Sequence, residues 1–154
     1  MNSLIREMMP VLARHEGVWV GTYRHLDPDG VLEDQYEVRS ICEFPEDGSC
    51  DFRLTSVNRW PDGRTQTLVN EARLSDGRLQ WSNERLVGGM WEVDDLTVYT
   101  RFGYAGDQTL TVCEMIQISH DGHHRARTWH WFRDERLFRI TLTQERREEE
   151  APAS

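Results

Sequence analysis

Hydrophobic and polar residues alternate along most of the chain, after an N-terminal segment with a different pattern. Residues 2–16 carry apolar positions at helical spacing, with Pro10 suited to begin a second helical turn and Gly17 to end it. From Gly17 onward the pattern changes to strict alternation, which predicts β-strands. The expected strands span residues 18–26, 33–44, 51–60, 64–74, 78–85, 86–93, 96–103, 109–119, 123–132 and 136–145.

Asp-Gly pairs separate many of these strands, at residues 29–30, 47–48, 62–63, 76–77 and 121–122. Such a pair between alternating segments favours a tight hairpin, because aspartate tolerates and glycine prefers the positive φ that the turn needs. The connections are too short for a crossover helix, so consecutive strands are expected to pair antiparallel. We therefore predict an all-β protein: an up-and-down antiparallel barrel of about ten strands, which leaves no open edge, preceded by a short helix.

Length and composition fit one domain, expected over residues 1–147, with a helical part at 2–16, a barrel at 17–146 and a solvated tail at 148–154. The net charge of −9 argues against a nucleic-acid or membrane partner. The chain has no lysine, which excludes Schiff-base chemistry. Three cysteines at unrelated spacings, with no signal peptide, favour a reducing, cytoplasmic setting. A homodimer is compatible with the sequence.

Counting outward from each turn predicts which side chains face the barrel interior. A tight turn at residues 121–122 sets Glu114 opposite Trp129, with Arg125 and Arg127 on the same face. That face is far more apolar than the other. We therefore expect it to point inward and to carry both arginines and Glu114 with it.

The same counting at other turns extends the predicted interior. At residues 134–135 it places inside Phe138, Ile140 and Leu142, and outside Arg139, Thr141 and Thr143. At residues 94–95 it sets Trp91 opposite Val98, also inside. Over the remaining strands, counting and alternation place inside Tyr36, Asn58, Trp60, Asn70, Trp81, Asn83, Trp129 and Trp131. A purely structural core would avoid so many polar groups, because each one left without a partner costs roughly 1–3 kcal/mol. The mixture predicts a cavity that holds a ligand.

The first strand opens with HEGVWVGTYRHLDPDG, in which Gly17-Val18-Trp19 resembles the G-x-W element of lipocalins and related calycins. This resemblance implies that Trp19 plugs the closed end of the barrel near a basic residue, for which Arg125 is the candidate. It also implies that Tyr23 and His25 lie on the inner side of the first strand. The run from Gly17 to Arg147, with EMIQISHDGHHRARTWHWF and RLFRITLTQERR near its end, resembles a bacterial family of uncharacterised calycin-like barrels distantly related to phycobiliprotein lyases. The resemblance implies a calycin fold and brings no settled activity.

Glu114 and Arg127 are expected to be diagonal neighbours on the inner face, within reach of a charge-assisted hydrogen bond. They form either a structural ion pair or a site in which Arg127 anchors a substrate anion and Glu114 transfers a proton. Tyr23 and His25 complete the catalytic candidates as further acids or hydrogen-bond donors. The ligand-binding candidates are Tyr36, Asn58, Trp60, Asn70, Trp81, Asn83, Trp91, Trp129 and Trp131, whose indole rings suit a flat ligand.

We carry two hypotheses of function from the sequence. The first is a cofactor-independent lyase or isomerase acting on a small aromatic or polyketide-like acid, by analogy at the level of fold with phenolic acid decarboxylases, small lipocalin-like barrels with a Tyr/Arg/Glu site. The alternative is a non-catalytic carrier or sensor of a hydrophobic ligand. We expect no metal and no cofactor, since the HDGHH stretch at 120–124 reads as an exposed turn.

Overall fold

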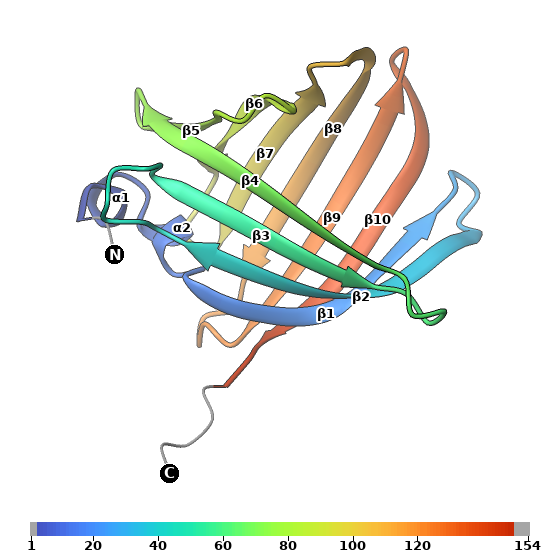
Figure 1. The fold of residues 1–154 in the computed structure, drawn as a ribbon, viewed down its shortest axis with the longest axis horizontal. Helices are drawn as coiled ribbons and strands as arrows, with labels where there is room; N and C mark the ends of the chain where they lie inside the picture. The colour runs from blue at the N-terminus through green and yellow to red at the C-terminus, as the bar shows by residue number, and fades with distance from the viewer. Residues whose placement is uncertain (1–2, 150–154) are drawn as a thin grey trace.

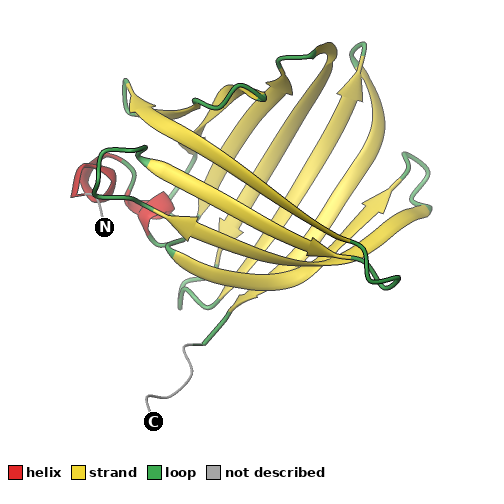
Figure 2. Ribbon diagram, in the orientation of Figure 1, coloured by secondary structure: helices red, strands yellow, loops and turns green. Residues whose placement is uncertain are grey.

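The computed structural model describes residues 3–149, in which two short helices precede ten strands (Figures 1 and 2). The helices are α1 (Ser3–Met8) and α2 (Pro10–Ala13), and Pro10 opens the second as predicted. The strands are β1 (Gly17–Leu26), β2 (Leu32–Glu43), β3 (Phe52–Arg59), β4 (Thr65–Ser75), β5 (Arg78–Trp81), β6 (Leu86–Glu92), β7 (Thr97–Tyr104), β8 (Asp107–Ile118), β9 (His124–Arg133) and β10 (Arg136–Arg147).

The strands close into one antiparallel barrel, in which every strand pairs with its neighbours in sequence and β1 pairs with β10. The predicted fold is confirmed. Residue 2 and residues 150–154, at the ends of the expected helical part and tail, lie outside the described residues. Glu148, which was expected in the tail, pairs with Arg39 of β2 at 2.8 Å. Neither helix within residues 3–149 is long and apolar enough to cross a membrane.

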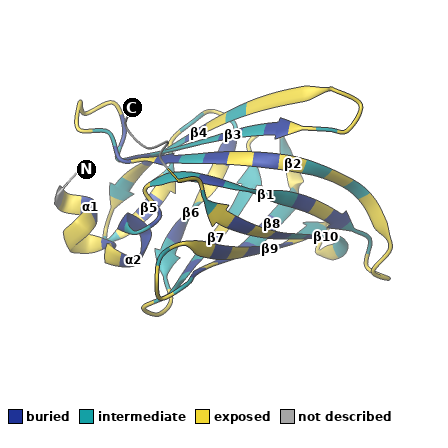
Figure 3. Ribbon diagram, turned by 90° about the horizontal axis from the view of Figure 1, so that it is seen from below, coloured by how far each residue is buried: buried dark blue, intermediate teal, exposed yellow. Residues whose placement is uncertain are grey.

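Buried and exposed residues alternate along the strands, as the sequence pattern requires (Figure 3). The β8–β9 register is the predicted one, with Glu114 opposite Trp129 and Ile116 opposite Arg127. Both charged side chains face the interior, where Glu114 is 4% and Arg127 is 3% exposed. Tight turns therefore set this register correctly.

The β9–β10 register differs from the predicted one by a single residue. The turn at Asp134 and Glu135 has positive φ at both residues, as expected, but a β-bulge between Leu137 and Arg139 inserts Phe138 without a partner. A one-residue insertion reverses the faces of everything beyond it. The inner face of β10 therefore carries Thr141, Thr143 and Glu145, and the expected inner positions of Phe138, Ile140 and Leu142 were wrong.

A second correction concerns β6 and β7. The turn at residues 94–95 is wider than two residues, because the Val93 amide bonds to the Thr97 carbonyl. Trp91 consequently pairs with Tyr99 instead of Val98 and lies on the outer face, where it contacts the Tyr99 ring and stacks under Arg78.

Helices α1 and α2 lie at one end of the barrel (Figure 1). Their apolar side chains pack with Trp19 in one buried hydrophobic cluster. The Trp19 side chain is fully buried, its indole donates to the His15 carbonyl at 2.9 Å, and Arg125 lies 4.7 Å from its ring centre, as the calycin resemblance implied. Helix α2 is fixed to the barrel because the amides of Val11 and Leu12 both donate to Glu92 Oε1.

Candidate functional site

The barrel interior holds a cavity of about 310 Å³ above the plugged end. Ten of the thirteen site residues predicted from the sequence line it: Tyr23, His25, Tyr36, Asn58, Asn70, Trp81, Glu114, Arg127, Trp129 and Trp131. Further lining residues that the sequence did not assign to the site include Arg85, Phe102, Tyr104, Arg139 and Thr141. The alternation of the strands therefore brings most of the predicted residues into one chamber.

Three predicted site residues do not line this cavity. Asn83 lies behind the wall, where its amide donates to Asn70 Oδ1 at 2.9 Å. Trp60 packs on the Tyr36 ring with 4.2 Å between ring centres and donates to Asp34. Trp91 is on the outer face, as its register requires.

Glu114 and Arg127, which line the cavity, belong to a buried charge cluster that also contains Arg125 and Glu145. Arg127 Nε donates to Glu114 Oε2 at 2.8 Å, and its Nη1 donates to the Tyr23 hydroxyl at 3.1 Å. The same Nη1 lies 3.6 Å from Glu145 Oε1, while Arg125 Nε donates to Glu145 Oε2. The two positive and two negative charges balance, which offsets the cost of burying them.

The pKa values of the two carboxyls in this cluster are shifted in opposite directions. Burial raises the pKa of the Glu114 carboxyl despite its contact with Arg127. Burial would also raise the pKa of Glu145, but Arg125 and Arg127 together hold it below the usual range. Burial raises the pKa of Tyr23 to about 12. Glu114 is therefore the carboxyl that takes up a proton more readily, and Tyr23 is a hydrogen-bond donor at neutral pH.

A hydrogen-bonded group of side chains lies higher on the cavity wall. His25 contacts the Thr141 hydroxyl through Nδ1 at 2.6 Å and the Tyr36 hydroxyl through Nε2 at 2.8 Å. Trp131 Nε1 donates to the same Thr141 hydroxyl at 2.9 Å. Burial, with a smaller contribution from Arg139, lowers the pKa of His25 to about 4, so the ring is neutral at neutral pH.

Arg85 is a cation of the wall that the sequence reasoning missed. Its Nη2 donates to Asn70 Oδ1 at 2.6 Å and its guanidinium lies 5.6 Å from the centre of the Tyr104 ring. The other lining arginines have carboxylate partners, Glu114 for Arg127 and Glu33 for Arg139. Within residues 3–149 no carboxylate lies within ion-pair distance of Arg85. Arg85 therefore retains an unneutralised positive charge beside the cavity.

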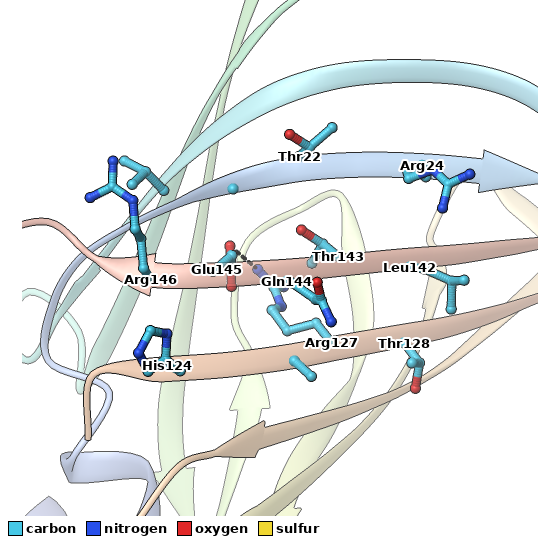
Figure 4. A pocket seen from close by; sticks show the side chains of 13 residues that line it. Thr22, Arg24, His124, Arg127, Thr128, Leu142, Thr143, Gln144, Glu145 and Arg146 are labelled. Carbon is cyan, nitrogen blue, oxygen red and sulfur yellow. Dashed lines mark ion pairs between the residues drawn. The ribbon is translucent and has the colours of Figure 1, made fainter. Parts of the chain in front are cut away.

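A groove of about 670 Å³ crosses the outer face of β1, β10 and β9 (Figure 4). Its outward side chains include Arg24, Gln144 and Arg146, all exposed, and the Arg127–Glu145 ion pair lies on the inner side of the same strands. The interior is the candidate site, because among the described residues buried charges and aromatic rings meet there.

The HDGHH turn is exposed at its three histidines, as predicted. Among the residues that the structure describes, no group of three or more His, Cys, Asp or Glu side chains is arranged to hold a metal ion.

No family model and no curated protein matches this sequence. Solved structures share the fold. An S-type phycobiliprotein lyase from Guillardia theta matches with a TM-score of 0.73 and 16% identity, over 91% of this chain and 92% of that one. Rv2717c from M. tuberculosis matches with a TM-score of 0.64 and 13% identity, over 92% and 98% of the two chains.

A DUF3598-family protein from Nostoc punctiforme also matches, with a TM-score of 0.68 and 16% identity over 89% of this chain. This chain spans about half, 49%, of that protein's length. At these identities the likeness shows the fold alone. It confirms the expected barrel, which shares its fold with a phycobiliprotein lyase.

Proposed function

We propose that the barrel binds a small, flat, conjugated acid inside its cavity and holds the acid group at Arg85. The observation that carries this proposal is a cavity wall of aromatic rings with an excess of positive charge. Of the three arginines that line the cavity, Arg127 and Arg139 pair with glutamates, and Arg85 pairs with no carboxylate among the described residues, in a protein whose net charge is −9. A cationic chamber inside an acidic protein selects for an anionic ligand, because the field that a ligand feels is that of the chamber wall.

Arg85 is a better anchor for a carboxylate than Arg127. The guanidinium of Arg127 already contacts Glu114, Glu145 and the Tyr23 hydroxyl. The four charges of that cluster already balance, so a ligand carboxylate there would add a third negative charge without a matching positive one. Arg85 is only half buried and lacks a carboxylate partner in the described residues, so it gains most from an anionic ligand.

The size and lining of the cavity limit the ligand further. A volume of about 310 Å³ is near the lower end for small-molecule sites, so the ligand has one or two rings. The rings of Trp129, Tyr23 and Phe102 supply flat apolar surface for it. Buried polar atoms without a partner in the described residues, Trp81 Nε1 and Asn58 Oδ1, belong to the same wall and favour a ligand with polar substituents.

A second candidate function is cofactor-independent lyase or isomerase chemistry on the same acid. The observation that favours it is Glu114, a buried carboxyl of the cavity lining with a raised pKa, next to Arg127 and Tyr23. A carboxyl tuned toward neutral pH suits proton transfer to or from a bound substrate. In this scheme Glu114 moves the proton while Arg127 and Tyr23 stabilise the anion that forms.

A panel of aromatic acids tests both candidates. Each compound is incubated with the protein while tryptophan fluorescence is followed, and the compound is then recovered and analysed by liquid chromatography and mass spectrometry. Binding of flat acids without chemical change supports the carrier. A changed compound supports the enzyme, in which case Glu114→Gln abolishes turnover and retains binding. If no acid in the panel quenches the fluorescence, the proposal is wrong.

A further inference from the structure

Four side chains on adjacent strands form a continuous hydrogen-bonded chain across the cavity wall. Trp131 lies on β9, Thr141 on β10, His25 on β1 and Tyr36 on β2, and these strands are neighbours in the barrel in that order. The three links measure 2.9, 2.6 and 2.8 Å. Thr141 and His25 are almost fully buried, and Tyr36 is at the cavity.

The direction of this chain follows from its first link. An indole N–H can only donate, so Trp131 fixes the Thr141 oxygen as an acceptor on one side. The remaining partner of that buried hydroxyl in the described residues is His25 Nδ1, and the hydroxyl proton needs an acceptor. Thr141 therefore donates to Nδ1, which leaves the proton of the neutral imidazole on Nε2.

The same reasoning continues to Tyr36. With its proton on Nε2, His25 donates to the Tyr36 oxygen. The hydroxyl proton of Tyr36 then has no acceptor among the described residues, and the side chain lines the cavity. The low pKa of His25 agrees with this arrangement, because a neutral ring is needed for Nδ1 to accept.

We propose that this chain holds the Tyr36 hydroxyl as an oriented donor, which selects ligands that present a hydrogen-bond acceptor, such as a ketone or ether oxygen, to the cavity wall. The choice of ligand rests on the proposed function, whereas the direction of the chain does not. Thr141 is the positioning residue, because it alone distinguishes the two ring nitrogens of His25. Tyr36 by itself would accept from Nε2–H or donate to Nε2 equally well.

Nitrogen NMR of protein with ¹⁵N-labelled histidine tests the direction without any ligand. Two-bond correlations from the ring carbon protons identify the protonated nitrogen, and the His25→Asn variant assigns the signal. We expect His25 to be neutral with its proton on Nε2 at neutral pH. Thr141→Ser should keep this tautomer, and Thr141→Val should give a mixture of the two. A proton on Nδ1, a charged ring or an unchanged tautomer in Thr141→Val would overturn the proposal.

A matched pair of probes tests the selectivity. Cinnamate and para-acetylcinnamate share the flat ring and the carboxylate, and only the second adds a ketone. Tyr36→Phe should weaken para-acetylcinnamate binding by about threefold to tenfold, the value of one hydrogen bond, and leave cinnamate nearly unchanged. Tyr99→Phe, on the outer face, is the control and should change neither. Equal effects of Tyr36→Phe on both probes would refute the selectivity. If neither probe binds the unmodified protein, the proposed acid-binding function fails while the tautomer still decides the direction of the chain.

Discussion

Substituting Glu145 should reveal how strongly the barrel depends on its buried charge cluster. The Glu145 side chain is fully buried, contacts Arg125, lies 3.6 Å from Arg127 Nη1 and accepts from the Ser40 hydroxyl at 3.2 Å. At an effective dielectric constant of about 20, unit charges 3.6 Å apart attract by roughly 5 kcal/mol. Glu145→Gln keeps the shape and removes the charge, so Arg125 remains buried without a counter-charge.

We expect Glu145→Gln to lower the free energy of unfolding by about 3–5 kcal/mol, the usual cost of breaking a buried ion pair from one side. This is a large part of the total of roughly 5–15 kcal/mol for a domain, and for a chain of this size it lowers the Tm by about 6–20 °C. Urea unfolding followed by circular dichroism measures the change.

Two controls separate charge from volume. Glu71→Gln breaks the more exposed pair with Arg53 and should cost less than about 1 kcal/mol. The double variant Glu145→Gln, Arg125→Met removes the uncompensated charge and should be more stable than Glu145→Gln alone. The reasoning is refuted if Glu145→Gln costs no more than Glu71→Gln, or if the double variant recovers nothing.

Two further predictions concern pH and backbone geometry. Burial, aided by Arg139 and opposed by Asp34 and Glu33, lowers the pKa of His25 from 6.5 to about 4, so the folded state resists its protonation. The contribution of His25 to stability should therefore be fully present above pH 6.5 and be lost as the pH falls toward 4. His25→Gln should make the urea midpoint depend less on pH over this range. An unchanged dependence of the midpoint on pH would contradict this prediction. Gly88 has a φ of +131°, and a Cβ added there would overlap the Arg101 carbonyl oxygen. Gly88→Ala should therefore lower the free energy of unfolding in urea by more than about 2 kcal/mol. Gly106→Ala, where an added Cβ meets no other atom, should change it very little. Equal costs would disprove it.

The fold could be predicted from the sequence because its turns carry strong local signals. Gly77 and Gly122 have positive φ, as Asp-Gly hairpins require, and the registers counted from those turns are correct. These two turns and the three-residue loop at 61–63 place Trp81, Trp129 and Asn58 inside. Where a turn determines the strand register, alternation determines which side chains face the interior. Most residues of the cavity wall can therefore be predicted.

The inner face of β10 could not be predicted in the same way. The β-bulge at Phe138 lies beyond the turn and is marked by no glycine, so nothing local signals the extra residue. Apolar Ile140 and Leu142 then appeared to belong inside, where the structure places Thr141 and Glu145. The polar partners of His25 and Arg125 were missed for this reason.

Arg85 was missed for a different reason. It lies after the short strand β5, in a segment expected to continue that strand to residue 85, and the Asn83 side chain instead bonds to the Leu86 amide. The alternation of apolar and polar residues does not predict where side chains of such a loop point. Its role follows only from the contacts with Asn70 and Tyr104 beside the cavity.

Calorimetric binding of cinnamate and of methyl cinnamate, which has the same ring and no charge, tests the central claim most directly. If Arg85 holds the acid, cinnamate binds more tightly than the ester, and Arg85→Met weakens cinnamate by about tenfold or more while leaving the ester nearly unchanged. Arg24→Met, on the exposed outer face, changes neither. Equal affinities for acid and ester, or full affinity for cinnamate in Arg85→Met, would contradict the account.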